Sequence, residues 1–203
     1  MNERSFIARL NIITTMNEKK TRILAATEKL LAEFGFHGLS MQMVAKEANV
    51  AAGTIYRYFN DKDDLLNQLH DHILSYIAAQ ISHGVVDTMP IKQRYRTMWL
   101  NLWHMTLNGD APLIIRGQFQ NLPCRSKQER KHLSQKLFSS VATMFNEGKA
   151  CGLFKNIDNE VLSILSLETS CNLARRQING GLQINDDELE AVINASWDAI
   201  ILH

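Results

Sequence analysis

Apolar residues recur every three or four positions along most of this chain, which is the spacing of one face of an α-helix. After residue 77, no segment alternates apolar and polar residues as a half-buried strand would, and no tandem repeat is present. The pattern therefore predicts an all-α protein of about nine helices.

Capping residues and glycines delimit four helices in the N-terminal part. Asn17 and Ser40 carry the short polar side chains that favour helix N-caps, and Gly35 with Gly38 provides a stop signal. Asn60-Asp61 caps a further helix in the same way. The expected helices cover residues 18–33, a short stretch that follows Ser40, 51–59 and 62–77.

The remainder of the chain has start and stop signals of the same kind. Proline, Ser, Asp or Asn stands at each expected helix start, and glycine, asparagine or proline follows most of the ends. The expected helices cover residues 90–107, 112–121, 126–150, 158–177 and 186–201.

The third helix combines residue types that rarely share a short helix. At about 100° per residue, Thr54, Arg57 and Tyr58 share one face, while Ile55 and Phe59 share the opposite face. Hydroxyl and guanidinium groups on one face suit a helix that enters the major groove of DNA. The alternative, a solvated amphipathic helix, would favour Lys and Glu at these positions.

The preceding helix completes a helix-turn-helix pattern. It directs Val44 and Ala45 inward and projects Gln42 and Lys46 on the other side. Two short helices joined by a turn of three or four residues form the motif that many DNA-binding proteins use. Tyr56 lies at the boundary of the two faces of the third helix, where its ring can pack while its hydroxyl reaches outward.

The stretch over residues 21–74, which includes the run Gly-Thr-Ile-Tyr-Arg-Tyr-Phe, resembles the N-terminal DNA-binding domain of the TetR/AcrR family of bacterial repressors. The resemblance covers about a quarter of the chain and implies a two-fold dimer that binds a palindromic operator. One departure is Ala51, where the family pattern has a Ser or Thr cap. An N-cap bond of this kind contributes about 1 kcal/mol.

The resemblance also implies which residues contact DNA. Five positions match residues that contact phosphates, namely Ser40, Thr54, Tyr56, Tyr58 and Lys62. Three positions match residues near base edges, namely Gln42, Gly53 and Arg57. Lys46 projects from the same helix as Gln42 and joins the expected DNA-binding set.

Three regions are expected along the chain. Residues 1–16 are an N-terminal arm or extension, residues 17–77 the TetR-type head, and residues 78–203 a helical body for ligand binding and dimerisation. The arm either lies ahead of a true start at Met16 or uses Arg4 and Arg9 to touch the DNA backbone.

Charge and cysteine usage restrict the classes of function. The formal net charge is +1, and residues 17–77 hold seven Lys/Arg against eight Asp/Glu, so bulk attraction to nucleic acid is excluded. The three cysteines are far apart, which fits a reducing cytoplasm and excludes a disulfide framework. No histidine spacing is typical of a metal site, so we expect neither a metal nor a cofactor. No apolar run reaches the roughly 20 residues of a membrane helix.

Aromatic residues of the body are candidates for an effector pocket. Trp99 and Trp103 lie one turn apart, and aromatic side chains form adaptable apolar walls. The other candidate lining residues are Phe119, Phe138, Phe145, Glu168 and Asn172. Glu168 beside the aromatic walls would suit a lipophilic cation. The alternatives are that these rings form ordinary core and that Glu168 pairs with Arg175.

Small residues predict a dimer interface. Ser163, Ser166, Ser170 and Ala174 form a stripe spaced by three, four and four residues, where a neighbouring backbone could approach closely. The last helix offers apolar residues at helical spacing, namely Leu189, Ile193, Trp197 and Ile200. Two such helices per subunit can form a four-helix interface. The alternative is that the serines face water.

These features together predict a cytoplasmic, ligand-responsive repressor that a small lipophilic effector releases from its operator, with control of multidrug efflux as the expected role. A metabolite- or quorum-signal-responsive regulator and an effector-independent architectural protein are the alternatives. An enzyme is not expected, because the Gly-x-Ser-x-Gly, nucleotide-loop and His-Glu-x-x-His motifs are missing from the sequence.

Overall fold

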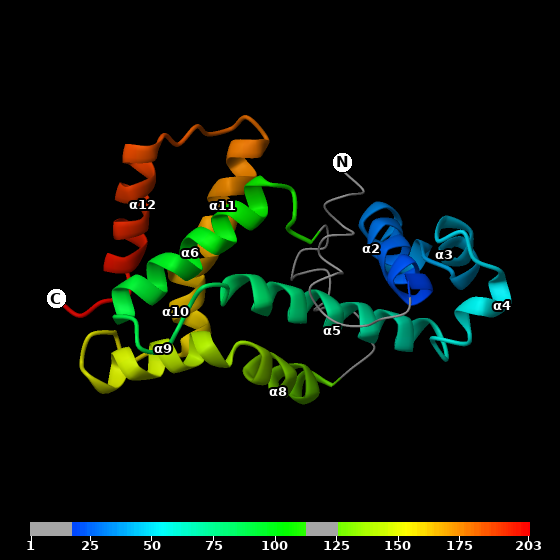
Figure 1. Cartoon of the computed structure of the whole chain (residues 1–203), viewed down its shortest axis with the longest axis horizontal. Coiled ribbons are helices and arrows are strands. Elements are labelled where there is room, and N and C mark those ends of the chain that lie inside the picture. Colours follow the sequence, from blue (N-terminus) through cyan, green and yellow to red (C-terminus); the bar gives the residue numbers. More distant parts are fainter. Residues whose placement is uncertain (1–17, 113–125) are drawn as a thin grey trace. The chain divides into compact units, whose positions relative to one another are not determined.

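A computed structural model describes residues 18–112 and 126–203. The described residues are helical, apart from turns and one isolated antiparallel bridge between Phe154 and Ile201 (Figure 1). The helices are α2 (Glu18–Gly38), α3 (Met41–Glu47), α4 (Ala52–Ile55), α5 (Lys62–Ile81), α6 (Ile91–Leu107), α8 (Lys127–Leu137), α9 (Ser139–Ala150), α10 (Asn159–Leu165), α11 (Leu167–Ile178) and α12 (Asp186–Asp198). The predicted all-α fold is confirmed. The expected arm, the expected helix over 112–121 and Phe119 lie almost entirely outside the described residues.

The described residues form two compact units. One comprises residues 18–76 with 126–134, and the other comprises residues 77–111 with 135–203. We call them the head and the body.

The head buries apolar side chains from α2 to α5 around one core. Ile23 and Leu24 of α2, Val44 of α3 and Leu65 of α5 are fully buried. Ser40 caps α3 as predicted, because its Oγ accepts a hydrogen bond from the Met43 N–H at 3.2 Å. The carboxylates of Asp61 and Asp64 cap α5 in a similar way by accepting backbone N–H bonds.

The first helix is interrupted at Gly35 as the stop signal predicts: the backbone there is non-helical, with a φ of 69° in the left-handed region, and a short helical stretch follows to Gly38. One predicted helix bound in the head was wrong. The third helix is only four residues long, and Ala51 at its N-cap makes no side-chain capping bond. Beyond Ile55 the chain continues in turns, in which the N–H groups of Arg57 and Tyr58 bond to carbonyls three residues back.

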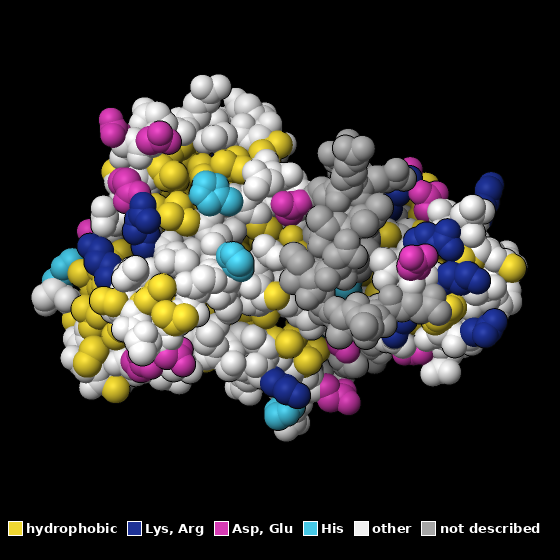
Figure 2. Space-filling model, in the orientation of Figure 1, with side chains coloured by type: hydrophobic (Ala, Val, Ile, Leu, Met, Phe, Trp, Pro, Cys, Tyr) yellow, Lys and Arg dark blue, Asp and Glu magenta, His cyan; other side chains and the backbone are white. Residues whose placement is uncertain are grey.

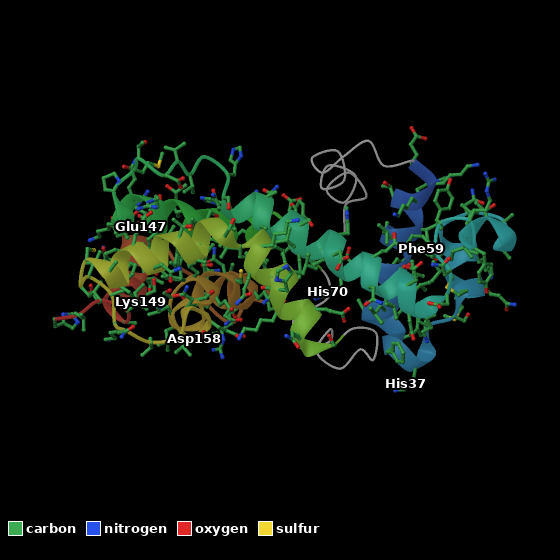
Figure 3. All side chains as sticks on the ribbon, turned by 90° about the horizontal axis from the view of Figure 1, so that it is seen from below. His37, Phe59, His70, Glu147, Lys149 and Asp158 are labelled. Atoms are coloured by element: carbon green, nitrogen blue, oxygen red, sulfur yellow. The ribbon has the colours of Figure 1, made fainter. Side chains whose placement is uncertain are left out.

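The body is built around α6, which packs mainly on α11. An aromatic chain runs through its core: Tyr95 packs on Trp197 at 5.1 Å, Trp197 on Phe154 at 5.2 Å, and Phe154 on Phe145 at 5.9 Å between ring centroids. Burial raises the pKa of Tyr95 to about 12, and its hydroxyl lies 2.8 Å from the Ser196 Oγ. Glu147 of α9, labelled in Figure 3, forms an ion pair with the buried Arg94 of α6.

Two long helices predicted in the body are each divided. The helix expected over 126–150 breaks at Phe138, which has φ −95° and ψ 29°. The helix expected over 158–177 breaks at Ser166, which has φ −126° and ψ −76°. The Ser166 hydroxyl donates to the Leu162 carbonyl at 2.6 Å, a type of bond that bends helices. The last helix is shorter than predicted and ends at Asp198.

Candidate nucleic-acid interface

A tight turn sets α4 against α3. Asn49 takes the left-handed conformation with φ 53°, which asparagine tolerates better than most residues. The Val50 N–H then bonds to the Ala45 carbonyl at 2.9 Å. The turn therefore fixes the two short helices as one helix-turn-helix unit.

The two faces of the 51–59 segment differ as the periodicity predicts. Ile55 is fully buried and Phe59, labelled in Figure 3, is 1% exposed, so both anchor the segment to the head core. Arg57 is exposed, and Thr54 is half-buried. Tyr56 departs from its predicted boundary position, because 56% of its surface is exposed.

Several polar side chains of α3 and the 51–59 segment have no partner within the described residues. Gln42, Lys46, Tyr56 and Arg57 are exposed and make no hydrogen bond or ion pair there. Their donors and acceptors are therefore available to a molecule that docks on this surface. We call these four side chains, with Thr54, the recognition surface.

Ser40 and Lys62 both have roles inside the head, of which the sequence pattern predicts the cap by Ser40 but not the contact of Lys62. The Ser40 hydroxyl caps α3, and the Lys62 ammonium donates to the Phe36 carbonyl at 2.6 Å. The same ammonium lies 4.3 Å from the centroid of the Phe36 ring. Lys62 thus binds the end of α2, yet an ammonium has three donors and keeps some for an outside acceptor.

Positive charge gathers on this part of the molecule despite its balanced composition. On the face shown in Figure 2, Lys and Arg side chains cluster over the region of α2 to α4. Lys29 pairs with Glu47 at 2.5 Å, while Asp61 and Asp64 are engaged in capping α5. The carboxylates of the head are thus partly satisfied within it, and Lys46 and Arg57 stay available.

Comparison with known proteins agrees with this geometry. Residues 23–69 match the family model described as bacterial regulatory proteins, tetR family, and residues 90–201 match the Tetracyclin repressor-like, C-terminal domain. The chain belongs to the TetR family. It is therefore a DNA-binding transcriptional regulator with an N-terminal helix-turn-helix.

Three proteins illustrate the similarity. An uncharacterised HTH-type transcriptional regulator from Haemophilus influenzae is 34% identical over 190 residues, covering 91% of this chain and 99% of the relative. The structure of a putative TetR family transcriptional regulator from Vibrio parahaemolyticus is 50% identical, with a TM-score of 0.78 over 91% of this chain and 99% of that one. The fatty acid metabolism regulator protein of Bacillus subtilis is 29% identical over 113 residues, which is 54% of this chain and 58% of that protein.

The predicted effector residues are scattered between core and surface. Trp99 and Trp103 are buried, and their rings stack at 5.6 Å with an interplanar angle of 20°. Phe145 is also buried and packs on Phe154, while Phe138 is half-buried at the start of α9.

The two polar effector candidates lie on α11. Glu168 is half-buried and already engaged in an interaction within the protein, and Asn172 is exposed.

The predicted small-residue interface was wrong for most of its members. Ser166, Ser170 and Ala174 are completely buried inside one subunit. The Ser170 hydroxyl is satisfied by the Leu167 carbonyl at 2.6 Å, and α11 packs closely on α6 of the same body. The small residues thus allow an approach of helices within the subunit, and Ser163 alone of the stripe is partly accessible.

The apolar residues proposed on the last helix also belong largely to the core. Ile193, Trp197 and Ile200 are 3%, 5% and 0% exposed, so a partner subunit cannot reach them, and only Leu189 is half-buried. Exposed apolar side chains occur instead on α10, where Val161, Ile164 and Leu165 are 43%, 48% and 44% exposed. Sequence periodicity identifies an apolar face but does not tell which neighbour covers it.

The described residues contain no helix that is both long and apolar enough to cross a membrane. Nor do they contain a group of three His, Cys, Asp or Glu side chains arranged to hold a metal ion.

Proposed function

We propose that this chain is a repressor that binds a palindromic operator as a homodimer and releases it when a small, apolar effector binds the body. The recognition surface carries this proposal, because it offers exposed donors and acceptors on a helix-turn-helix, and most of them have no partner among the described residues. The spacing of the cysteines further supports a cytoplasmic site of action.

Within the recognition surface, Arg57 and Gln42 are the proposed base-edge readers. A guanidinium can bond two acceptors of guanine, and an amide can bond the donor and acceptor of adenine. Lys46, Thr54 and Tyr56 are proposed phosphate contacts, together with Ser40, Tyr58 and Lys62. Phosphate contacts set the register, while base contacts supply the sequence preference.

Gly53 supports a close approach of DNA to α4. Its φ does not lie in the left-handed region, and a Cβ added there would meet no atom within 4 Å. The fold of the head therefore does not require glycine at this position. Close approach of an outside molecule would explain why a side chain is absent.

Replacing Gly53 tests this function directly. Gly53→Ala should stabilise the free protein by up to about 1 kcal/mol, because alanine favours helix, yet weaken binding to an operator selected from random DNA. Gly181→Ala is the matched control, since its added Cβ would lie 3.6 Å from the nearest atom and far along the chain from the head. If Gly53→Ala binds operator as tightly as the control, DNA does not approach α4 closely and the assignment fails.

The homodimer is proposed with a revised interface. Val161, Ile164 and Leu165 form an exposed apolar face on α10 that a second copy of the chain would cover. A two-fold partner places a second head on the same operator, and half-sites about 34 Å apart are typical of such pairs.

Multidrug efflux control is the role that the family resemblance favours, and a metabolite-responsive role is the second candidate. The second candidate is supported by the name of the fatty acid metabolism regulator relative. The engagement of Glu168 within the protein also weakens the case for a cationic effector. Operator release by cationic dyes would favour the first role, and release by fatty-acid derivatives the second.

A further inference from the structure

Trp99 carries a buried hydrogen-bond donor that has no partner in the described part of the chain. Its side chain is 0% exposed, and its indole Nε1 has no acceptor among the described residues. Buried N–H groups are nearly always paired, because leaving water without a new acceptor is unfavourable. A buried indole N–H of this kind can donate to an oxygen acceptor that a ligand supplies.

Several buried side chains on the same helix as Trp99 are apolar and adaptable. The Trp103 ring stacks on one side of it, and Met98, Leu102 and Met105 of the same helix are buried. Methionine side chains are flexible and polarizable, so they can repack around a guest molecule. These neighbours would accept a hydrocarbon portion.

Charge in the body interior selects against a charged ligand. Arg94 is the one buried charged residue among the described residues of the body, and Glu147 forms an ion pair with it. The other unpaired buried donor of the body is the Nε of Arg94 itself, which belongs to that paired guanidinium. A carboxylate or ammonium on the ligand would therefore be buried without a free counter-ion, which is costly.

We propose that Trp99 anchors the effector by donating its indole N–H to a carbonyl-type oxygen of a neutral, largely hydrocarbon molecule. This inference rests on the proposed effector response of the body and narrows the effector class from a lipophilic cation to a neutral ketone, ester or similar compound. The Trp99–Trp103 pair forms one wall of the site.

A matched series of eleven-carbon probes tests the head group: methyl nonyl ketone, undecane, undecanoate and undecylammonium. The full-length protein, labelled with ¹⁵N in tryptophan, gives indole N–H signals from its three tryptophans, and Trp-to-Phe variants assign them. The ketone should move the Trp99 signal downfield as the N–H gains an acceptor. Undecane should produce no such shift.

The affinity of Trp-to-Phe variants for the ketone and for undecane provides a second measurement. Trp99→Phe keeps a ring but removes the donor, so it should weaken ketone binding about tenfold, the effect of one lost hydrogen bond. It should weaken undecane binding no more than Trp103→Phe does, since both variants shrink the same apolar wall. Trp103→Phe is the control that alters the same wall and leaves the Trp99 donor in place, so the preference for ketone over undecane should persist.

Several results would overturn the proposal. The first is a Trp99 signal that the ketone does not move. The second is a ketone that binds no more tightly than undecane. The third is undecanoate or undecylammonium binding more tightly than the ketone. Failure of all four probes to bind would overturn it as well. Binding of the selected operator is measured separately without probes, so a wild-type protein that does not bind DNA would contradict the proposed function and not the Trp99 site.

Discussion

Arg57 and Lys62 are both predicted DNA contacts, but their side chains have different surroundings. Arg57 is exposed and has no partner in the described head, whereas the Lys62 ammonium donates to the Phe36 carbonyl. Removing the first side chain should affect DNA binding alone. Removing the second should affect both binding and folding.

Arg57→Ala should weaken binding to the selected operator by about 1–3 kcal/mol per half-site and reduce sequence preference, because a base contact is lost. Titration against operator and scrambled duplexes at several salt concentrations measures both effects. Equal losses on the two duplexes would show that Arg57 contacts phosphate only.

Lys62→Met should lower the free energy of unfolding by about 1–2 kcal/mol, because a charge-assisted hydrogen bond and a cation–π contact disappear. It should also flatten the salt dependence of DNA binding, as the loss of a phosphate contact does. Lys46→Met is the control, since Lys46 is exposed and unpartnered in the described head. An unfolding free energy equal to that of the control would rule out the capping role of Lys62.

Among the helices, α9 depends on a glycine for its packing. A Cβ at Gly148 would lie 2.0 Å from the Phe154 Cδ2, and the Phe154 ring is held between Phe145 and Trp197. The ring therefore has little room to move. Glycine at this position permits the turn after α9 to fold back onto the helix. In Figure 3, Lys149 marks the end of α9 and Asp158 marks the start of α10.

Gly148→Ala should destabilise the body by about 1–3 kcal/mol through overpacking, despite the better helix propensity of alanine. Urea unfolding followed by circular dichroism gives the change, with Gly181→Ala as the control. Wild-type stability would mean that Phe154 finds another position at little cost.

At the scale of the whole molecule, substitutions at the buried Ser166 and at the exposed Ile164 should have different effects on folding and assembly. Ile164→Glu places a charge on the exposed apolar face of α10, so it should yield a folded monomer. Ser166→Arg places a charge in the interior of the subunit and should unfold the body. Sedimentation measures assembly, and circular dichroism measures helix content. A dimeric Ile164→Glu protein would move the interface away from α10.

The residues that cap the N-termini of several helices could be predicted from the sequence. Ser40, Asp158 and Asn185 accept the expected backbone N–H bonds at their helix starts, and Ser126 exchanges bonds with Glu129. Each of these bonds joins residues at most three positions apart, so the local pattern contains the needed information. The buried pair of Ile55 and Phe59 follows from helical spacing in the same way.

Other features depended on partners far along the chain. The contact of Lys62 with Phe36 spans 26 residues. The stripe of Ser166, Ser170 and Ala174 is buried inside the body, in which α11 packs on α6. Periodicity reports that one face of a helix is to be covered, but the covering element is chosen by the packing of the whole body. The caps and the two faces of the short helices in the head could therefore be predicted from the sequence. The inner position of the small-residue stripe, and a Trp99 donor without an acceptor among the described residues, arise only when the helices pack together.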